Sequence, residues 1–164
     1  KGYADTLDVF DALWQKGQDI NLVMVGKKGW KIDALAERIK THPEYNRRLF
    51  WLAGISDEYL EKVYGTCTCL IAASYGEGFG LPLIEAAQKG MPIIARDIPV
   101  FREVAGNHAT YLPKDMNAHS AGKVIAQWLK RYHKGKVLGS ESIPWLTWRE
   151  SSKNLLASIL EEKG

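Results

Sequence analysis

Two glutamates bracket a glycine-rich turn, and the residue types around them suit the binding of a phosphate and a sugar. Glu77 and Glu85 are separated by the seven residues 78–84, which contain Gly78 and Gly80. An ionised carboxylate only accepts hydrogen bonds, and its two oxygens can take both hydroxyls of a diol. One glutamate is therefore a candidate sugar ligand and the other a candidate ribose ligand.

The turn itself predicts an anion site at the start of a helix. Pro82 fits the first helical position, where its missing N–H is not needed and its φ is already helical. The free N–H groups of Gly80 and Leu81 would then point at a bound anion, with the helix dipole behind them. The alternative is a plain strand-to-helix turn that needs glycine for positive φ, flanked by a solvated loop acid and a dipole-favourable helix acid. The pair of carboxylates favours the binding site.

The elements that position this turn are read from hydrophobic periodicity. Short apolar runs predict strands over residues 20–25, 49–53, 67–73, 92–95 and 109–112. Helical spacing predicts helices over residues 3–16, 32–40, 57–65, 81–89, 100–105 and 116–133, and a last one capped by Thr147. Strands separated by helices pair in parallel through right-handed crossovers. The expected fold is α/β, a Rossmann-like doubly wound parallel sheet with helices on both faces.

Topology then places the chemistry. In open α/β sheets the ligand binds outside the carboxyl ends of the strands. The turn at residues 74–80 follows the predicted strand 67–73 and therefore lies at that edge.

Size and charge exclude several classes of function. The chain has 164 residues, which fits one domain, and no apolar run approaches the roughly 18 residues of a membrane span. A net charge of +3 gives no reason to expect a nucleic-acid partner. The densest basic run lies between Lys130 and Lys136 and is interpreted as a solvated helix end, with contact to an anionic membrane surface as the less favoured alternative.

The two cysteines are interpreted as core residues. Cys67 and Cys69 are two positions apart in a predicted strand, so both thiols should lie on one face of it. Two thiols are too few to hold a metal. Unpaired thiols and the lack of a visible signal peptide favour a cytoplasmic location, with peripheral membrane contact as an addition to it.

A family resemblance is carried by ten consecutive residues. The segment 77–86, Glu-Gly-Phe-Gly-Leu-Pro-Leu-Ile-Glu-Ala, resembles the signature of group 1 glycosyltransferases, the retaining glycosyltransferase family 4. Other family-like pieces follow in the expected order: Lys1-Gly2, residues 22–26, 50–64 and 92–95, and Trp148 at the opening of the last helix. The resemblance covers nearly the whole chain.

The resemblance implies a GT-B fold, in which two Rossmann-like domains face each other across a cleft. Residues 1–164 would be the C-terminal, nucleotide-sugar-binding domain. The N-terminal acceptor domain and the first strand would lie outside the chain, and the fragment alone would be inactive. The implied reaction transfers a sugar from a nucleotide diphosphate sugar to an acceptor hydroxyl with retained anomeric configuration. No metal or other cofactor is expected, because a helix N-terminus and a lysine can stabilise the departing diphosphate.

The resemblance also implies roles for individual positions, while no residue of this fragment is assigned as catalytic. The implied ligands are Glu77, Gly78, Phe79 and Gly80 for the donor sugar, Lys1, Gly80 and Leu81 for the diphosphate, Glu85 for the ribose, and Ile55 and Ser56 for the base pocket.

Other functions fit the residues less well. A non-catalytic nucleotide- or sugar-phosphate-binding module would use the same helix start and is the main alternative. A receiver-like or flavodoxin-like domain lacks its acidic cluster after an early strand. The turn at residues 26–29 matches neither a dinucleotide fingerprint nor a Walker A loop. A glycosidase pair would need two carboxylates facing each other across the scissile bond, whereas Glu77 and Glu85 flank one turn.

Overall fold

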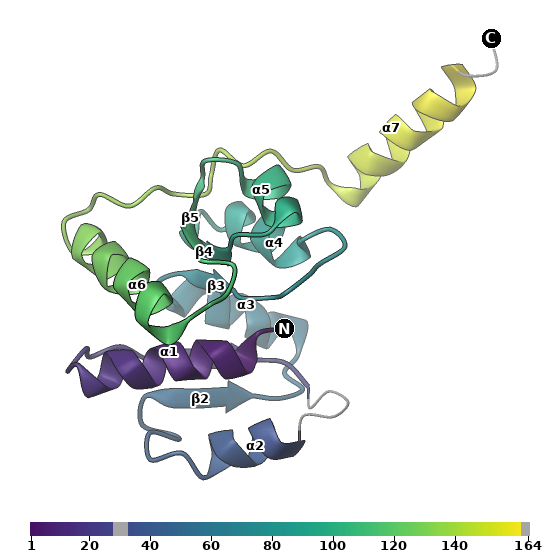
Figure 1. The fold of residues 1–164 in the computed structure, drawn as a ribbon. Coiled ribbons are helices and arrows are strands. Elements are labelled where there is room, and N and C mark those ends of the chain that lie inside the picture. Colours follow the sequence, from purple (N-terminus) through teal and green to yellow (C-terminus); the bar gives the residue numbers. More distant parts are fainter. Residues whose placement is uncertain (28–32, 162–164) are drawn as a thin grey trace.

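The computed structural model describes residues 1–27 and 33–161, and helices alternate with short strands throughout them (Figure 1). The helices are α1 (Tyr3–Gln15), α2 (Asp33–Lys40), α3 (Asp57–Thr66), α4 (Leu81–Gln88), α5 (Pro99–Ala105), α6 (Ala118–Tyr132) and α7 (Trp148–Glu161). The strands are β1 (Leu22–Val25), β2 (Leu49–Leu52), β3 (Leu70–Ala72), β4 (Ile93–Arg96) and β5 (Ala109–Leu112). Residues 28 and 29 of the first glycine-rich turn, and residue 32 of the second predicted helix, lie outside the described residues.

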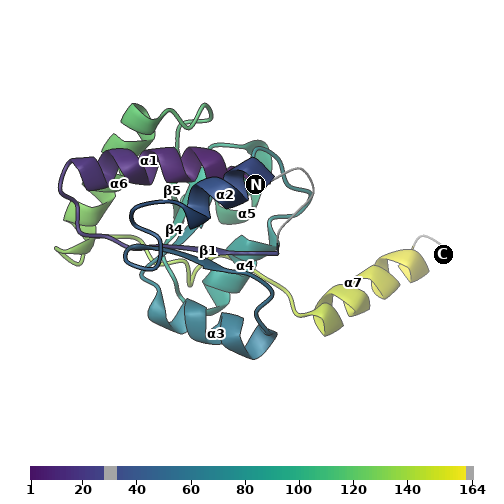
Figure 2. The ribbon, with the colours of Figure 1, turned by 90° about the horizontal axis from the view of Figure 1, so that it is seen from below.

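All of the strand pairings are parallel, which confirms the predicted α/β class. β1 pairs with β2, and β3, β4 and β5 form a second sheet in that order. The expected single sheet is thus divided in two, because β1 and β3 do not pair with each other among the described residues. Figure 2 shows α1 and α6 on one side of the strands and α3 on the other.

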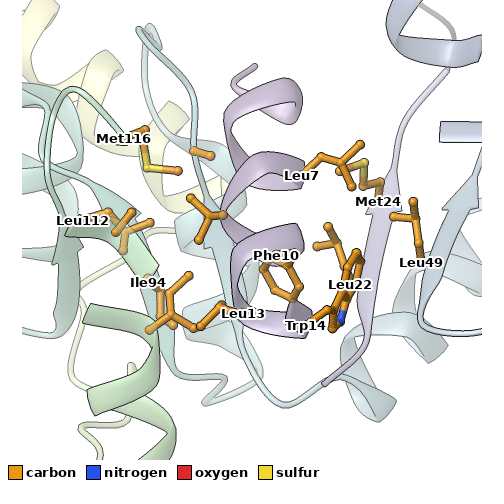
Figure 3. Close-up of a cluster of buried hydrophobic side chains, with 14 of the residues drawn as sticks. Leu7, Phe10, Leu13, Trp14, Leu22, Met24, Leu49, Ile94, Leu112 and Met116 are labelled. Atoms are coloured by element: carbon orange, nitrogen blue, oxygen red, sulfur yellow. The ribbon is translucent and has the colours of Figure 1, made fainter. Parts of the chain in front are cut away.

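Helix α1 joins the two sheets through one hydrophobic cluster. Figure 3 shows Leu7 and Trp14 directed toward β1, which contributes Leu22. Leu13 lies on the other side of the helix, near Ile94 of β4. Helix α1 also packs along α6, so its apolar residues are buried nearly all round.

The opposite face of the three-stranded sheet is covered by α4 and α5. Leu83 of α4 and Phe101 of α5 pack there with Ile93 and Ala95 of β4. Because Ile94 between them packs in the other cluster, β4 is buried on both faces. This explains why its sequence is a continuous apolar run rather than an alternating one.

The prediction for the two cysteines was half right. Both pack against hydrophobic clusters, as expected for core residues, but they pack against different ones. Helix α3 continues to Thr66, Cys67 caps its end and β3 begins only at Leu70. The two thiols therefore do not share a strand face. Burial raises the pKa of the Cys69 thiol to about 12, which keeps it protonated.

The predicted loop after α6 is partly a core element. Ile143 is buried in the cluster under α4. The Ser140 hydroxyl, also buried, donates a 2.6 Å hydrogen bond to the carbonyl of Met91. This segment ties the end of α6 to the connection between α4 and β4.

Helix α7 begins with the predicted Thr147 cap and extends away from the rest of the fold (Figures 1 and 2). The Glu150 N–H donates to the Thr147 hydroxyl, and the Glu150 carboxylate accepts the Thr147 N–H in return. Large apolar side chains of this helix are exposed: Trp148, Leu155, Leu156, Ile159 and Leu160. No helix within residues 1–27 and 33–161 combines the length and apolarity that crossing a membrane requires.

Candidate functional site

The glycine-rich turn lies at the carboxyl end of β3 and leads into α4, as predicted. Gly80 caps the helix with φ of 81°, a left-handed conformation that glycine adopts without strain. The helix begins at Leu81, so Pro82 is its second residue, one position later than predicted. The N–H groups of Gly80 and Leu81 have no hydrogen-bond partner in the part of the chain that the structure describes. They form an open anion site.

Glu77 lies on one side of this turn, paired with Lys1. Its Oε1 accepts the ammonium of Lys1 and a 2.7 Å hydrogen bond from the Ser74 hydroxyl. Lys1, and after it Ser74, lower the pKa of the Glu77 carboxyl, which is therefore ionised at neutral pH. Its Oε2 has no protein partner among the described residues and is free to accept a hydrogen bond from a ligand.

Glu85 lies on the second turn of α4 and contacts α3. The Tyr64 hydroxyl donates a 2.8 Å hydrogen bond to Oε2 of Glu85. Burial and the Glu85 carboxylate raise the pKa of Tyr64, so Tyr64 stays a neutral donor. The other Glu85 oxygen, Oε1, has no hydrogen-bond partner within residues 1–27 and 33–161. Sequence reasoning missed both Tyr64 and Ser74, although Ser74 lies within the turn itself.

The predicted base-pocket residues, Ile55 and Ser56, lie apart from both Glu77 and Glu85. Ser56 caps α3, and its hydroxyl accepts the Tyr59 N–H at 3.3 Å. Ile55 is half-buried beside it. Tyr64 lies eight residues further along α3, about 12 Å at 1.5 Å per residue. The described contacts therefore do not join Ile55 or Ser56 to Glu85.

The remaining residues of the turn are open to solvent. Phe79 is 62% exposed and Leu81 is 47% exposed. A Cβ atom at Gly78 would meet no other atom, so a ligand can approach the backbone there. Gly80 lies over the Phe101 ring, which supports the turn from the core side.

A buried arginine, unforeseen from the sequence, joins the ends of all three strands of the β3–β5 sheet. Arg96 is 1% exposed at the end of β4. Its guanidinium donates 2.8 Å hydrogen bonds to the carbonyls of Ala73 and Lys114, and also pairs with Asp5 of α1. Tyr75 lies over this guanidinium, with its ring centre 4.1 Å away. The signal in the sequence was a cation ending an apolar strand, and its partners could not be identified from it.

A pocket of about 310 Å³ opens between this arginine-supported turn and the start of α5. It is lined by Tyr75, Glu77, Ile98, Pro99, Val100 and Lys114. Within residues 1–27 and 33–161, no three His, Cys, Asp or Glu side chains gather closely enough to hold a metal ion. The expectation that the site uses no metal stays a prediction.

Comparison with known proteins identifies a family match over most of the chain. The family model described as glycosyl transferases group 1 matches residues 1–143. The serotype-specific mannosyltransferase WbdA of Escherichia coli is 50% identical over 159 residues, which are 97% of this chain and 19% of that protein. O-antigen chain mannosyltransferase B, also of Escherichia coli, is 32% identical over 104 residues, 61% of this chain and 26% of the relative. The chain thus spans about a fifth to a quarter of these curated relatives.

Solved structures of GT-B glycosyltransferases share the fold. Sucrose-phosphate synthase from Thermosynechococcus elongatus superposes with a TM-score of 0.70 at 23% identity, covering 96% of this chain and 42% of that one. TarM superposes with a TM-score of 0.73 at 20% identity, covering 98% of this chain and 32% of that one.

Proposed function

The chain belongs to the group 1 glycosyltransferase family, and from this premise we propose that it is the donor-binding domain of a retaining glycosyltransferase. The whole enzyme would transfer a sugar from a nucleotide diphosphate sugar to an acceptor hydroxyl. The observation that carries the proposal is the arrangement around α4. Two free backbone N–H groups lie between Glu77 on one side and Glu85 on the other.

In this proposal the diphosphate binds at the start of α4. The N–H groups of Gly80 and Leu81 and the helix dipole would stabilise its charge, which grows as the sugar leaves. Lys1, which pairs with Glu77, would bridge the diphosphate and the sugar. The backbone of Gly78, with open space above it, would contact the sugar hydroxyls.

The proposed sugar is mannose, because the similar proteins are named mannosyltransferases. Glu77 would accept hydrogen bonds from mannose hydroxyls, with Phe79 beside it, and Glu85 would accept the ribose diol. Ile55 and Ser56 would border the base, reached by a nucleoside lying along α3. The proposed location is the cytoplasm. The exposed basic end of α6 would be the point of contact with a membrane surface, which is the less favoured part of this proposal.

Titration of the chain with the diphosphates of uridine, guanosine and adenosine, and then with their mannose conjugates, tests the proposal. We expect one nucleoside diphosphate to bind and its mannose conjugate to bind more tightly. If only non-nucleotide phosphates bind at residues 78–85 in NMR spectra, the chain is a different phosphate-binding module.

Glu85→Ala is expected to weaken nucleoside diphosphate binding by roughly tenfold to a hundredfold, because hydrogen bonds to a charged group contribute about 1.5–3 kcal/mol. Calorimetry measures the change. Tyr64→Phe should give a smaller loss of affinity, because it removes the hydrogen bond that orients the Glu85 carboxylate but keeps the carboxylate itself. Glu37→Ala, an exposed glutamate of α2, is the matched control. Unchanged affinity in Glu85→Ala would remove Glu85 from the ribose site.

Glu77→Gln is expected to reduce the preference for the mannose conjugate over the bare nucleotide, by about tenfold, because the amide cannot replace two acceptor oxygens. In the wild type the affinity for the mannose conjugate, whose diphosphate has no group that titrates near neutral pH, should be constant at neutral pH, because Lys1 and then Ser74 lower the pKa of Glu77. It should fall only as the pH drops through that lowered pKa and the carboxylate is protonated. An affinity for the conjugate that changes near neutral pH would contradict the assignment.

We also propose that a preceding strand and an N-terminal acceptor domain complete the enzyme. In the doubly wound order 3-2-1-4-5-6, the first strand lies between the second and the fourth. With β1 and β2 as second and third, and β3 to β5 as fourth to sixth, the missing position falls between the two observed sheets. Helix α1 already spans this position from one face.

The exposed apolar face of α7 supports the proposal of an acceptor domain, because such a face usually marks an interaction site. Hydrogen exchange on a longer form that retains the sequence before Lys1 tests both parts. Amides of β1, β3 and α7 should exchange more slowly than in the chain alone, while β5 serves as the control. Equal exchange in the two forms would contradict both proposed contacts.

A further inference from the structure

Tyr75 is an exposed aromatic ring that is held rigidly in place. One face of the ring lies over the buried Arg96 guanidinium, and its hydroxyl donates a 2.8 Å hydrogen bond to Asp5. Asp5 in turn pairs with Arg96, so the three side chains form a closed set of contacts. The ring nevertheless remains 64% exposed. A rigid ring with one free face costs little entropy when a flat apolar surface stacks on it.

The pocket beside Tyr75 has the size and polarity for one sugar ring. Its volume of about 310 Å³ is near the lower end of ligand pockets, which start at about 300 Å³. Ile98, Pro99 and Val100 give it an apolar wall. Glu77 contributes a carboxylate with one oxygen that has no partner among the described residues, and Lys114 is an exposed lysine of the lining. Few polar groups in an apolar pocket fix the orientation of a ligand.

We propose that this pocket is a pyranose-binding subsite in which Tyr75 is the stacking platform and Lys114 is a specificity-determining residue. A pyranose has an apolar C–H face, which suits the Tyr75 ring, and a rim of hydroxyls. Lys114 donates to that rim, whereas Glu77 accepts from it. The inference deepens the proposed function and rests on it, because Glu77 joins this pocket to the diphosphate site.

The same pyranose could belong to the donor or to the acceptor. A nucleobase is the less favoured occupant, because Glu85 and Tyr64, the proposed ribose end, lie on the α3 side of α4 and do not line this pocket. Binding measurements separate the three occupants.

Calorimetry on residues 1–164 compares a nucleoside diphosphate with its mannose conjugate for the wild type and for five variants. Tyr75→Ala is expected to lower affinity for the conjugate by roughly threefold to tenfold, the range for one aromatic contact. Lys114→Ala is expected to lower it by roughly tenfold or more, because a hydrogen bond from a charged group is lost. Both variants should leave affinity for the bare nucleotide unchanged. Tyr75→Phe keeps the ring and its contact with Arg96 but loses the hydrogen bond to Asp5, so its affinity for the conjugate should lie between those of Tyr75→Ala and the wild type.

Tyr132→Ala and Lys136→Ala are the matched controls. Tyr132 is also an exposed ring stacked by one face on a buried side chain, Trp128, and Lys136 is an exposed lysine beyond α6. Neither should change either affinity. Thermal unfolding of each variant shows whether a lost affinity reflects lost folding.

NMR titration with methyl α-mannoside gives the second arm. If shifts at Tyr75 and Lys114 appear with this sugar while the conjugate's affinity is unaffected by Tyr75→Ala, the subsite belongs to the acceptor, and the pyranose assignment stands. Equal loss of nucleotide and conjugate in Tyr75→Ala would show base stacking and overturn it, as would no effect in both arms. A wild type that binds no nucleoside diphosphate would instead refute the proposed function itself.

Discussion

Arg96→Ala is expected to lower the free energy of unfolding by about 3–5 kcal/mol, the cost of removing one partner from a buried ion pair. The substitution removes donors from the carbonyls of Ala73 and Lys114 and leaves Asp5 without its cation. It also releases the lower face of the Tyr75 ring. The ends of β3, β4 and β5 would lose their common anchor, and with it the base of the glycine-rich turn.

Urea unfolding measures this loss, and Arg102→Ala is the matched control. Arg102 also pairs with a carboxylate, Asp97, and lies over a tyrosine ring, that of Tyr111, but the Arg102–Asp97 pair is about half exposed. An exposed pair of the same composition should contribute far less. Arg96→Lys keeps the charge but not the forked geometry and should fall between the wild type and Arg96→Ala. Equal losses in Arg96→Ala and Arg102→Ala would mean that burial is not what makes Arg96 important.

The order of helices and strands was predictable because each leaves a local signal. Apolar spacing gave the identity of the described helices and strands, and glycine or proline marked ends such as those at Gly80 and Pro82. Errors occurred at boundaries, where tertiary contacts decide. Strand β3 is shorter than predicted, because α3 continues to Thr66 and residues 67–69 form the connection to the strand, which begins at Leu70.

The division into two sheets was not predictable from local pattern. The apolar runs at β1 and β3 look alike to a periodicity reading, and pairing depends on which strand lies next to each in space. Helix α1 gives no sign of the division either, because its apolar residues pack against both sheets in one cluster.

The sequence predicted which residues lie around the glycine-rich turn, but not which side chains pair with one another there. The turn, Glu77 and Glu85 are where the motif placed them, at the carboxyl end of a strand. Lys1 was expected to contact phosphate, and in the structure it pairs with Glu77. The pair Asp5 and Arg96 lies 91 residues apart in the sequence, so only the folded topology brings the two together.

Gly2→Ala is expected to lower the free energy of unfolding by roughly 2–5 kcal/mol, from two separate causes. Gly2 has φ of 73°, which costs a residue with a Cβ atom about 1–2 kcal/mol. Its added Cβ would also lie 2.1 Å from the carbonyl oxygen of Ala73 and 3.1 Å from Arg96, and such overpacking costs about 1–3 kcal/mol. The contacted oxygen of Ala73 belongs to the backbone just after β3, so it cannot move away by rotation as the end of a side chain could.

Gly17→Ala separates these two causes. Gly17 has φ of 76°, nearly the same conformation, but a Cβ there would meet nothing within 4 Å. The effect of alanine on the unfolded chain is shared by both variants and cancels in their difference. Urea unfolding should therefore show Gly2→Ala about 1–3 kcal/mol less stable than Gly17→Ala, the contribution of the contact alone.

Gly2→Ala should also affect the binding site. The close approach of Gly2 to Ala73 positions the neighbouring Lys1 beside Glu77. Gly2→Ala is expected to weaken nucleoside diphosphate binding under conditions in which the protein is still folded, whereas Gly17→Ala leaves binding unchanged. If the two variants are equally stable and bind equally, the first residues move away from β3 without cost. The position of Lys1 would then be set by its ion pair with Glu77 and not by the close approach of Gly2.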